Sequence, residues 1–129
     1  MKKVSCLTND ELNYWVAKAQ AWKLDSQGKW LLDGEIMHFA EHYHPSTCWE
    51  QASALLLKCR NVSLFEDTRT YDRKTGEPRE CIAGWGLHCK ESDVDSFSRT
   101  PHRAICKAFV MSVYGDEVEN LPSHYPPLN

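Results

Sequence analysis

The segment Thr100–Gly115, TPHRAICKAFVMSVYG, carries the clearest structural signal in the chain. Thr100 can cap a helix, and Pro101 suits the first helical position because its missing N–H would have no partner there. Apolar residues then recur at helical spacing, at Ala104, Ile105, Ala108, Phe109 and Met111. Gly115 can adopt the positive φ that ends many helices. The segment therefore predicts a carboxy-terminal helix with one buried face.

Two further helices are predicted upstream. Within residues 8–24, Thr8 and Glu11 form a capping box, and Gln27-Gly28 is a stop signal. The apolar face of this helix comprises Leu12, Trp15, Val16, Ala19 and Trp22. A second helix is predicted to begin near Ser46, capped by Ser46 or Thr47, and to end at Arg60-Asn61.

Short strands are predicted between the helices. Lys29–Met37 should form a hairpin around Asp33-Gly34. Val62–Phe65, Thr68–Tyr71 and Cys81–Trp85 are typical of strands, whereas the polar residues 91–98 are typical of a loop. This order predicts an α+β fold with about three helices packed on one face of a small, mostly antiparallel sheet.

Length and composition narrow the class of protein. The 129 residues predict a single domain, 1–129, with an extended proline-containing tail from about residue 121. The net charge of −3 disfavours a protein that binds nucleic acid through phosphates. We find neither a secretory signal nor an apolar segment long enough to span a membrane, so we expect a cytoplasmic protein with no membrane partner.

Three segments together resemble a known family. They are Glu11–Ala19, Tyr43–Gln51, and the stretch from Thr100 to Val118. In this order they are similar to the NinX-like proteins of lambdoid and related phages. The resemblance implies a phage or prophage origin, an accessory role in the cytoplasm of a bacterial host, and no particular activity.

The chain departs from the family pattern at one place. Cys48 stands where the family tends to have Asp, and Ala52 and Ser53 stand where it tends to have paired Gly. If that Asp contacts a ligand, this chain lacks the contact.

Two predicted helix starts are rich in hydroxyl groups and basic side chains. Free amides at a helix start attract anions, and a nearby Arg adds charge-assisted hydrogen bonds. If the two starts converge, an indole ring could flank the bound anion and stack on a planar ligand. The predicted ligand-binding residues are Ser46, Thr47, Trp49, Trp85, Thr100, His102 and Arg103. The alternative is that Ser and Thr only cap their helices.

Other chemistry finds less support. His38, His42, His44 and Cys48 are a weak candidate metal set, as are Cys59, Cys81, His88 and Cys89, because neither has the spacing of a known zinc site. The carboxylates Asp93, Asp95, Asp116 and Glu117 show no recognisable acid–base signature. We therefore predict no metal, no cofactor and no catalytic residues, and we consider an enzyme less favoured than a binding protein.

Three functions remain open at this stage. The leading hypothesis is a non-enzymatic binder of an anionic, nucleotide-like small molecule. The first alternative is an effector that binds a host or phage protein, and the second is a small hydrolase. A homodimer is the default expectation for the oligomeric state.

Overall fold

The computed structural model describes residues 1–59, 61–68, 75–78 and 84–121. Helices in this part are α1 (Asn9–Ala19), α2 (Trp49–Leu56) and α3 (Pro101–Tyr114), with 3-10 turns η1 (Val4–Cys6) and η2 (Ala40–His42). Strand β1 (Lys2–Lys3) pairs with β8 (Glu117–Val118). A second antiparallel sheet contains β2 (Lys23–Leu24), β3 (Lys29–Leu32) and β4 (Glu35–Phe39), and a third contains β5 (Val62–Asp67), β6 (Gly84–Cys89) and β7 (Val94–Ser98).

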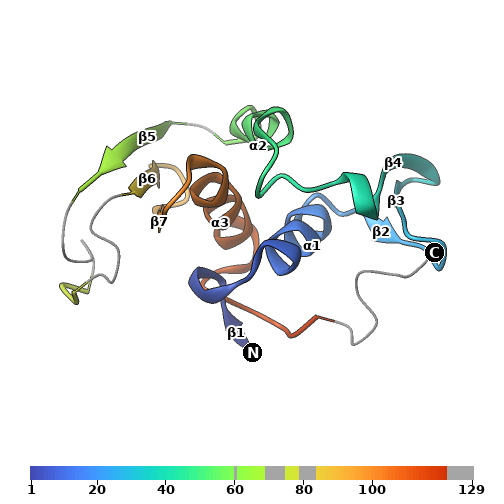
Figure 1. Ribbon diagram of the computed structural model, residues 1–129, viewed down its shortest axis with the longest axis horizontal. Coiled ribbons are helices and arrows are strands. Elements are labelled where there is room, and N and C mark those ends of the chain that lie inside the picture. The colour runs from blue at the N-terminus through green and yellow to red at the C-terminus, as the bar shows by residue number, and fades with distance from the viewer. Residues whose placement is uncertain (60, 69–74, 79–83, 122–129) are drawn as a thin grey trace.

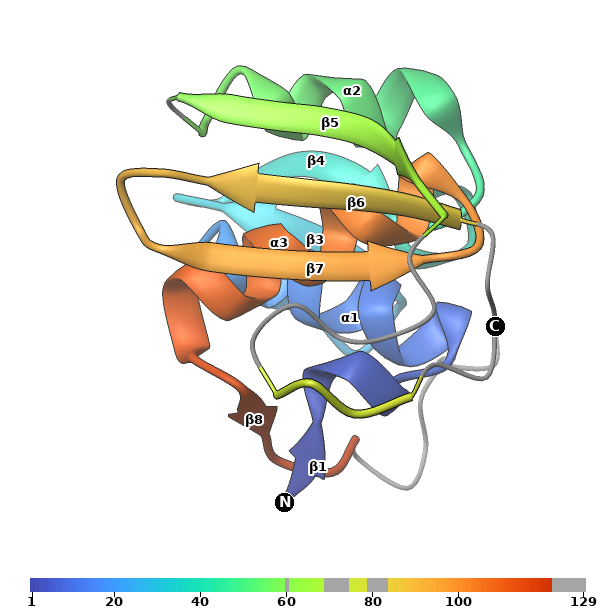
Figure 2. The ribbon, with the colours of Figure 1, turned by 90° about the vertical axis from the view of Figure 1, so that its left-hand side faces the viewer.

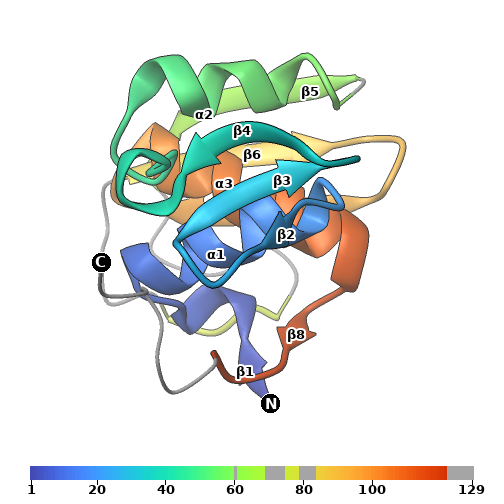
Figure 3. The same cartoon turned by 90° about the vertical axis from the view of Figure 1, so that its right-hand side faces the viewer.

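The α+β class is confirmed, but the strands do not form the single sheet that was expected. The helices lie between the two three-stranded sheets, with β5–β6–β7 on one side and β2–β3–β4 on the other (Figure 1). Figure 2 looks onto β5–β6–β7 with α3 behind it, and Figure 3 looks onto β2–β3–β4 with α1 behind it. The two outer sheets therefore present separate surfaces to solvent.

The core fills the space between these layers. In α1, Leu12 and Val16 are fully buried, and in α3 Ile105 and Val110 are buried equally well. Tyr14 of α1 packs on Trp30 of β3, with 5.5 Å between ring centroids. Because Trp30 is 0% exposed, it anchors the β2–β3–β4 sheet to α1.

The predicted signals of α3 are confirmed. Thr100 is the N-cap, and its Oγ1 accepts a hydrogen bond from the Arg103 amide at 3.2 Å. Pro101 is the first helical residue, and Gly115 ends the helix with a φ of 85°. The helix buries its predicted apolar stripe against the other two helices and the β5–β6–β7 sheet.

Helix α1 has the predicted capping box between Thr8 and Glu11, but it is shorter than expected. The helix ends at Ala19, and Ala21 takes a φ of 66°, which turns the chain away from the helix axis. Trp22 then packs on Tyr43, with 4.9 Å between ring centroids, and Leu24 pairs with Trp30 as part of β2. Trp22 therefore packs beyond the end of the helix and Leu24 belongs to a sheet, so neither residue extends the helix face.

The predicted hairpin around Asp33-Gly34 is confirmed. Both turn residues have positive φ, 51° and 85°, as a tight two-residue hairpin turn requires. Strand β4 carries a bulge, since Trp30 pairs with His38 while Leu31 pairs with Ile36. Met37 is the extra residue, so the two sides of β4 exchange faces there.

Helix α2 begins three residues later than predicted. Its N-cap is Cys48, which makes no side-chain capping bond, and its first residue is Trp49. The amides of Thr47 and Cys48 both donate to the His44 carbonyl at 3.0 Å, which makes a turn before the helix. The helix ends at Leu56, so the predicted end at residues 60–61 is too late.

The β5–β6–β7 sheet differs most from expectation. Residues 94–98 were predicted as loop but form β7. Residue 96 faces α3, where an apolar side chain would be expected, but it is a serine whose Oγ donates to the Ala104 carbonyl at 2.6 Å. The strand therefore lacks the apolar alternation by which it could have been predicted. Strand β5 extends through Asp67, past the predicted end at Phe65, and the described part of the predicted strand that follows lies in β6, Gly84–Cys89. The remaining expectations for residues 69–71, Cys81–Ala83 and 122–129 lie outside the described residues.

Candidate functional site

The starts of α1 and α3 and the turn before α2 meet at Asn9. Ser46 Oγ donates to the Asn9 carbonyl at 3.5 Å, and the Ser46 amide donates to Asn13 Oδ1 at 3.0 Å. From α3, the Arg103 guanidinium donates to Asn9 Oδ1 and, at 2.6 Å, to the Leu7 carbonyl. The structure thus brings together two segments that are far apart in the sequence, one holding Ser46 and the other Arg103. This convergence was a condition of the predicted ligand site and was not itself predicted.

Four more of the predicted residues lie at the same junction. Thr100 caps α3, and exposed Thr47 holds its hydroxyl 3.4 Å from His44 Nδ1. The indole of Trp49 and the imidazole of His102 meet edge to face, with 5.4 Å between centroids. His102 Nδ1 is buried and has no hydrogen-bond partner among the described residues. The rings therefore join the first turns of α2 and α3.

Positive charge is concentrated along one side of α3. Lys107 is 7% exposed, and its Nζ donates to the Phe97 carbonyl at 3.2 Å. Burial, reinforced by the nearby Arg103 guanidinium, lowers the pKa of Lys107 to about 8. Burial also lowers the pKa of Arg103 and raises the pKa of the Cys106 thiol to about 12. Neither cation forms an ion pair with a carboxylate of the described residues.

The junction uses its polar groups internally. Ser46 and Arg103 donate hydrogen bonds to backbone carbonyls and to asparagine side chains. The Thr100 hydroxyl accepts a hydrogen bond from an amide of its own helix. This arrangement holds three helices together. A ligand-binding role for these residues stays a prediction.

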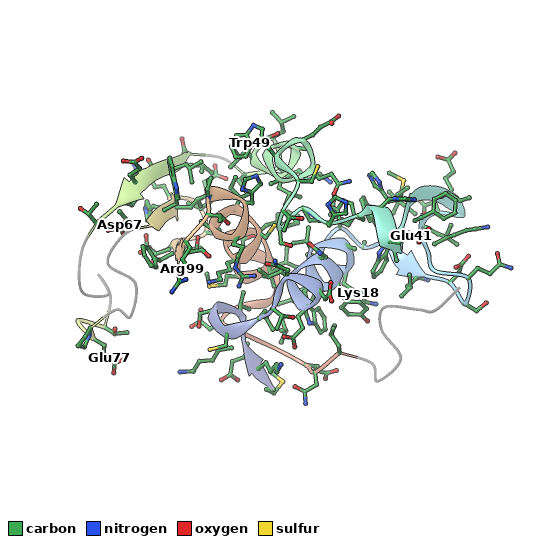
Figure 4. The ribbon with its side chains drawn as sticks, viewed as in Figure 1. Lys18, Glu41, Trp49, Asp67, Glu77 and Arg99 are labelled. Carbon is green, nitrogen blue, oxygen red and sulfur yellow. The ribbon has the colours of Figure 1, made fainter. Side chains whose placement is uncertain are left out.

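Trp85, the seventh predicted residue, lies elsewhere. It lines a pocket of about 280 Å³ together with Glu66, Thr68, Gly84 and Arg99. Trp85 is half-buried and belongs to β6, opposite Glu66 of β5 and Ser98 of β7. Figure 4 labels Arg99, Asp67 and Trp49. The pocket adjoins the helix junction, because Arg99 directly precedes Thr100, the N-cap of α3, but its lining includes no other predicted residue.

Four of the five pocket residues, Gly84 among them, were not predicted as site residues, for different reasons. Arg99 directly precedes the cap Thr100, so its position beside a predicted helix start could have singled it out. Glu66 and Thr68 carry no local signal. They reach Trp85 only through the register of β5 and β6, which a single sequence does not reveal.

A row of three polar residues crosses the outer face of β5–β6–β7. Ser63 pairs with His88, and His88 pairs with Asp95. His88 Nδ1 lies 2.8 Å from Asp95 Oδ1, as in the base and orienting acid of a serine hydrolase. Ser63 is exposed and makes no hydrogen bond to His88. The row thus lacks the contact between nucleophile and base that this chemistry needs.

The candidate metal-binding side chains are dispersed. His38 packs between Trp22 and Tyr43, where burial lowers its pKa, whereas His42 is exposed beside Glu41. No group of three His, Cys, Asp or Glu side chains within the described ranges is placed to hold a metal ion. Cys81 falls outside those ranges. Among the same residues, no helix is long and apolar enough to cross a membrane.

Comparison with known proteins gives one match. The model of a protein family described as "Bacteriophage P22, NinX" matches residues 3–113. This span contains the helix junction and all the residues that line the pocket. No curated protein matches the chain.

Proposed function

The chain belongs to the NinX family of bacteriophage P22, and we propose that it serves its phage as an accessory protein that binds an anionic, nucleotide-like small molecule. The observation that carries this proposal is the joint position of Trp85 and Arg99 in one pocket. An indole ring and a guanidinium group are a pair of side chains that recognise a planar ring and an attached anionic group.

The residues that line the pocket match three chemical groups on the proposed ligand. The Trp85 ring offers a flat apolar surface for stacking, and the exposed Arg99 guanidinium has no ion-pair partner among the described residues. Glu66 and Thr68 add a carboxylate and a hydroxyl group. A sugar hydroxyl can donate to Glu66 while a phosphate accepts from Arg99. A nucleotide contains all three groups.

The size of the pocket limits the ligand. Small-molecule sites typically enclose roughly 300–1,000 Å³, and this pocket of about 280 Å³ lies at the lower end. We therefore favour a mononucleotide over a dinucleotide. Such a ligand is a solute of the host cytoplasm, where the protein would sequester or sense it.

Calorimetric titration of the protein with the four ribonucleoside monophosphates tests this function. Inorganic phosphate and an uncharged nucleoside serve as partial ligands, and each should bind more weakly than the intact nucleotide. Trp85→Ala should weaken binding by roughly 10- to 100-fold, since stacking on an aromatic ring contributes about 1–3 kcal/mol per base. Arg99→Met should weaken nucleotide binding but leave nucleoside binding unchanged.

Matched controls separate this pocket from the rest of the surface. Phe39→Ala removes an exposed aromatic ring of β4, and Lys90→Met removes an exposed cation away from the pocket lining. Neither should alter nucleotide affinity. Absence of binding by every nucleotide, or equal losses in the control variants, would contradict the proposal.

A further inference from the structure

The β5–β6–β7 sheet holds the residues of the pocket in a fixed order. Glu66 of β5 pairs with Trp85 of β6, and Trp85 pairs with Ser98 of β7. Arg99 follows Ser98 directly and lines the same pocket as Glu66 and Trp85. Because β6 lies between β5 and β7 (Figure 2), Trp85 stands between Glu66 on one flank and Arg99 on the other. The order across the sheet is therefore carboxylate, aromatic ring and guanidinium.

The Glu66 side chain lies beside the Trp85 ring. Residues directly opposite each other in an antiparallel pair share one face of the sheet, and their Cβ atoms lie roughly 4.5–5.5 Å apart. Glu66 is exposed and forms no ion pair within the described ranges of the chain. Its carboxylate can therefore contact the edge of a planar ring that stacks on Trp85.

A nucleotide carries its groups in the same order as the pocket. The sugar joins the phosphate to the base, and the edge of the base that pairs in nucleic acids points away from the phosphate. If the phosphate binds Arg99 and the base stacks on Trp85, this pairing edge faces Glu66. The strand order thus favours the base edge over a sugar hydroxyl as the hydrogen-bond partner of Glu66.

We propose that Glu66 makes the pocket selective for a guanine nucleotide, an inference that rests on the proposed function. A carboxylate has two acceptor oxygens and no donor. Guanine carries two adjacent donors on its pairing edge, N1–H and the N2 amino group, and can therefore bond both oxygens at once.

The other three bases do not match a carboxylate in this way. Adenine and cytosine have an unprotonated ring nitrogen beside the amino group of the pairing edge, and uracil has a carbonyl on each side of its N3–H. Each of them would turn a lone pair toward the Glu66 carboxylate. Such unfavourable contacts add to the specificity that the guanine contacts supply.

Calorimetric titration with the monophosphates of guanosine, inosine and adenosine tests the selectivity. Inosine lacks the N2 amino group, and adenosine lacks both this group and the N1 proton. We expect guanosine monophosphate to bind at least about tenfold more tightly than adenosine monophosphate, with inosine monophosphate between them. 2′-Deoxyguanosine monophosphate should bind as tightly as its ribose counterpart, because Glu66 contacts the base and not the sugar.

Glu66→Gln tests whether this residue causes the preference. A carboxamide offers one acceptor and one donor, so it can pair with adenine as well as with guanine. The variant keeps Trp85 and Arg99 and should still bind nucleotides, but guanosine and adenosine monophosphate should bind it equally well. Glu91→Gln is the matched control because Glu91 is exposed between β6 and β7 and does not line the pocket. It should keep the wild-type preference.

The failure of this inference can be distinguished from the failure of the proposed function. If no nucleotide binds, both are wrong. If guanosine and adenosine monophosphate bind the wild-type protein equally, or if Glu66→Gln keeps the preference, only the role of Glu66 is overturned. A loss of affinity for the deoxyribose form, combined with equal binding of inosine and guanosine monophosphate, would assign Glu66 to the sugar and would also overturn the inference.

Discussion

The indole of Trp49 and the imidazole of His102 meet edge to face, with an interplanar angle of 78°. This contact joins the first turn of α2 to the first turn of α3. Trp49→Ala should destabilise the fold by about 1 kcal/mol, since an aromatic pair contributes roughly 0.5–1.5 kcal/mol beyond burial. Trp49→Phe keeps a ring and should cost less. Urea unfolding followed by circular dichroism measures both, and equal losses would argue against the ring contact.

Arg103 should matter for stability more than Arg99 does. The Arg103 guanidinium bonds Leu7 and Asn9, so Arg103→Met leaves a carbonyl and an amide oxygen without their donor. Hydrogen bonds to charged groups contribute about 1.5–3 kcal/mol, and we expect a loss in this range. Arg99→Met should change the free energy of unfolding by less than about 0.5 kcal/mol. A larger loss of stability in Arg99→Met than in Arg103→Met would show that the hydrogen bonds of Arg103 do not stabilise the fold.

Lys107 should make stability depend on alkaline pH. Its pKa is about 8 in the folded protein and about 10.5 when unfolded, so the unfolded chain binds more protons between these values. The free energy of unfolding should therefore rise as pH increases from 8 to 10.5, by on the order of 3 kcal/mol. Below pH 8 the cost of the buried charge is fully present.

Lys107→Met provides the comparison for this pH effect. The variant removes the buried ammonium group, so it should be more stable than wild type at pH 7, and the difference should shrink toward pH 10. Comparing the two proteins cancels the titration of their shared tyrosines and cysteines. A constant difference between them across this range would refute the assignment to Lys107.

Gly86 should resist substitution. A Cβ at this position would lie 2.7 Å from the Phe65 ring and 3.2 Å from Asp67 Oδ2. Gly86→Ala should therefore destabilise the protein by about 1–3 kcal/mol. Adding Phe65→Leu should recover part of this loss, because the smaller side chain gives the methyl group room. If Gly86→Ala alone melts at the wild-type temperature, the Phe65 ring does not pack closely on Gly86.

Ser63 should not react as a catalytic serine. Its hydroxyl makes no hydrogen bond to His88, so nothing in the described structure draws its proton away. A fluorophosphonate probe should leave the protein unlabelled, as judged by intact mass. Labelling that disappears in Ser63→Ala but persists in Ser53→Ala would instead favour the hydrolase alternative.

Local chemistry explains which parts of the fold were predictable. The cap Thr100, the first-turn Pro101 and the Asp33-Gly34 turn act on neighbouring residues, so their effects can be read from the sequence. The end of α1 was missed because Trp22 and Leu24 contact residues distant in the sequence, Tyr43 and Trp30, and do not continue the apolar face of the helix. Strand β7 was missed because Ser96 packs on α3 through a hydrogen bond to the Ala104 carbonyl, so the strand shows no apolar alternation.

The candidate sites divide in the same way. Ser46 and Arg103 were singled out because both flank predicted helix starts, and the structure brings them together through Asn9. What the sequence could not reveal is that these donors are already occupied inside the protein. The pocket depends on the pairing of Glu66 with Trp85 across two strands, which is a long-range property.

The ladder between β1 and β8 has a consequence for synthesis on the ribosome. Lys2 and Lys3 emerge early, but their partners Val118 and Glu117 follow only after on the order of ten seconds at roughly 5–20 residues per second. Until then the Val4 amide lacks its acceptor, the Asp116 carbonyl, to which it donates at 2.8 Å. A nascent chain stalled before residue 116 would therefore leave its first strand unpaired, and host proteases could recognise it there.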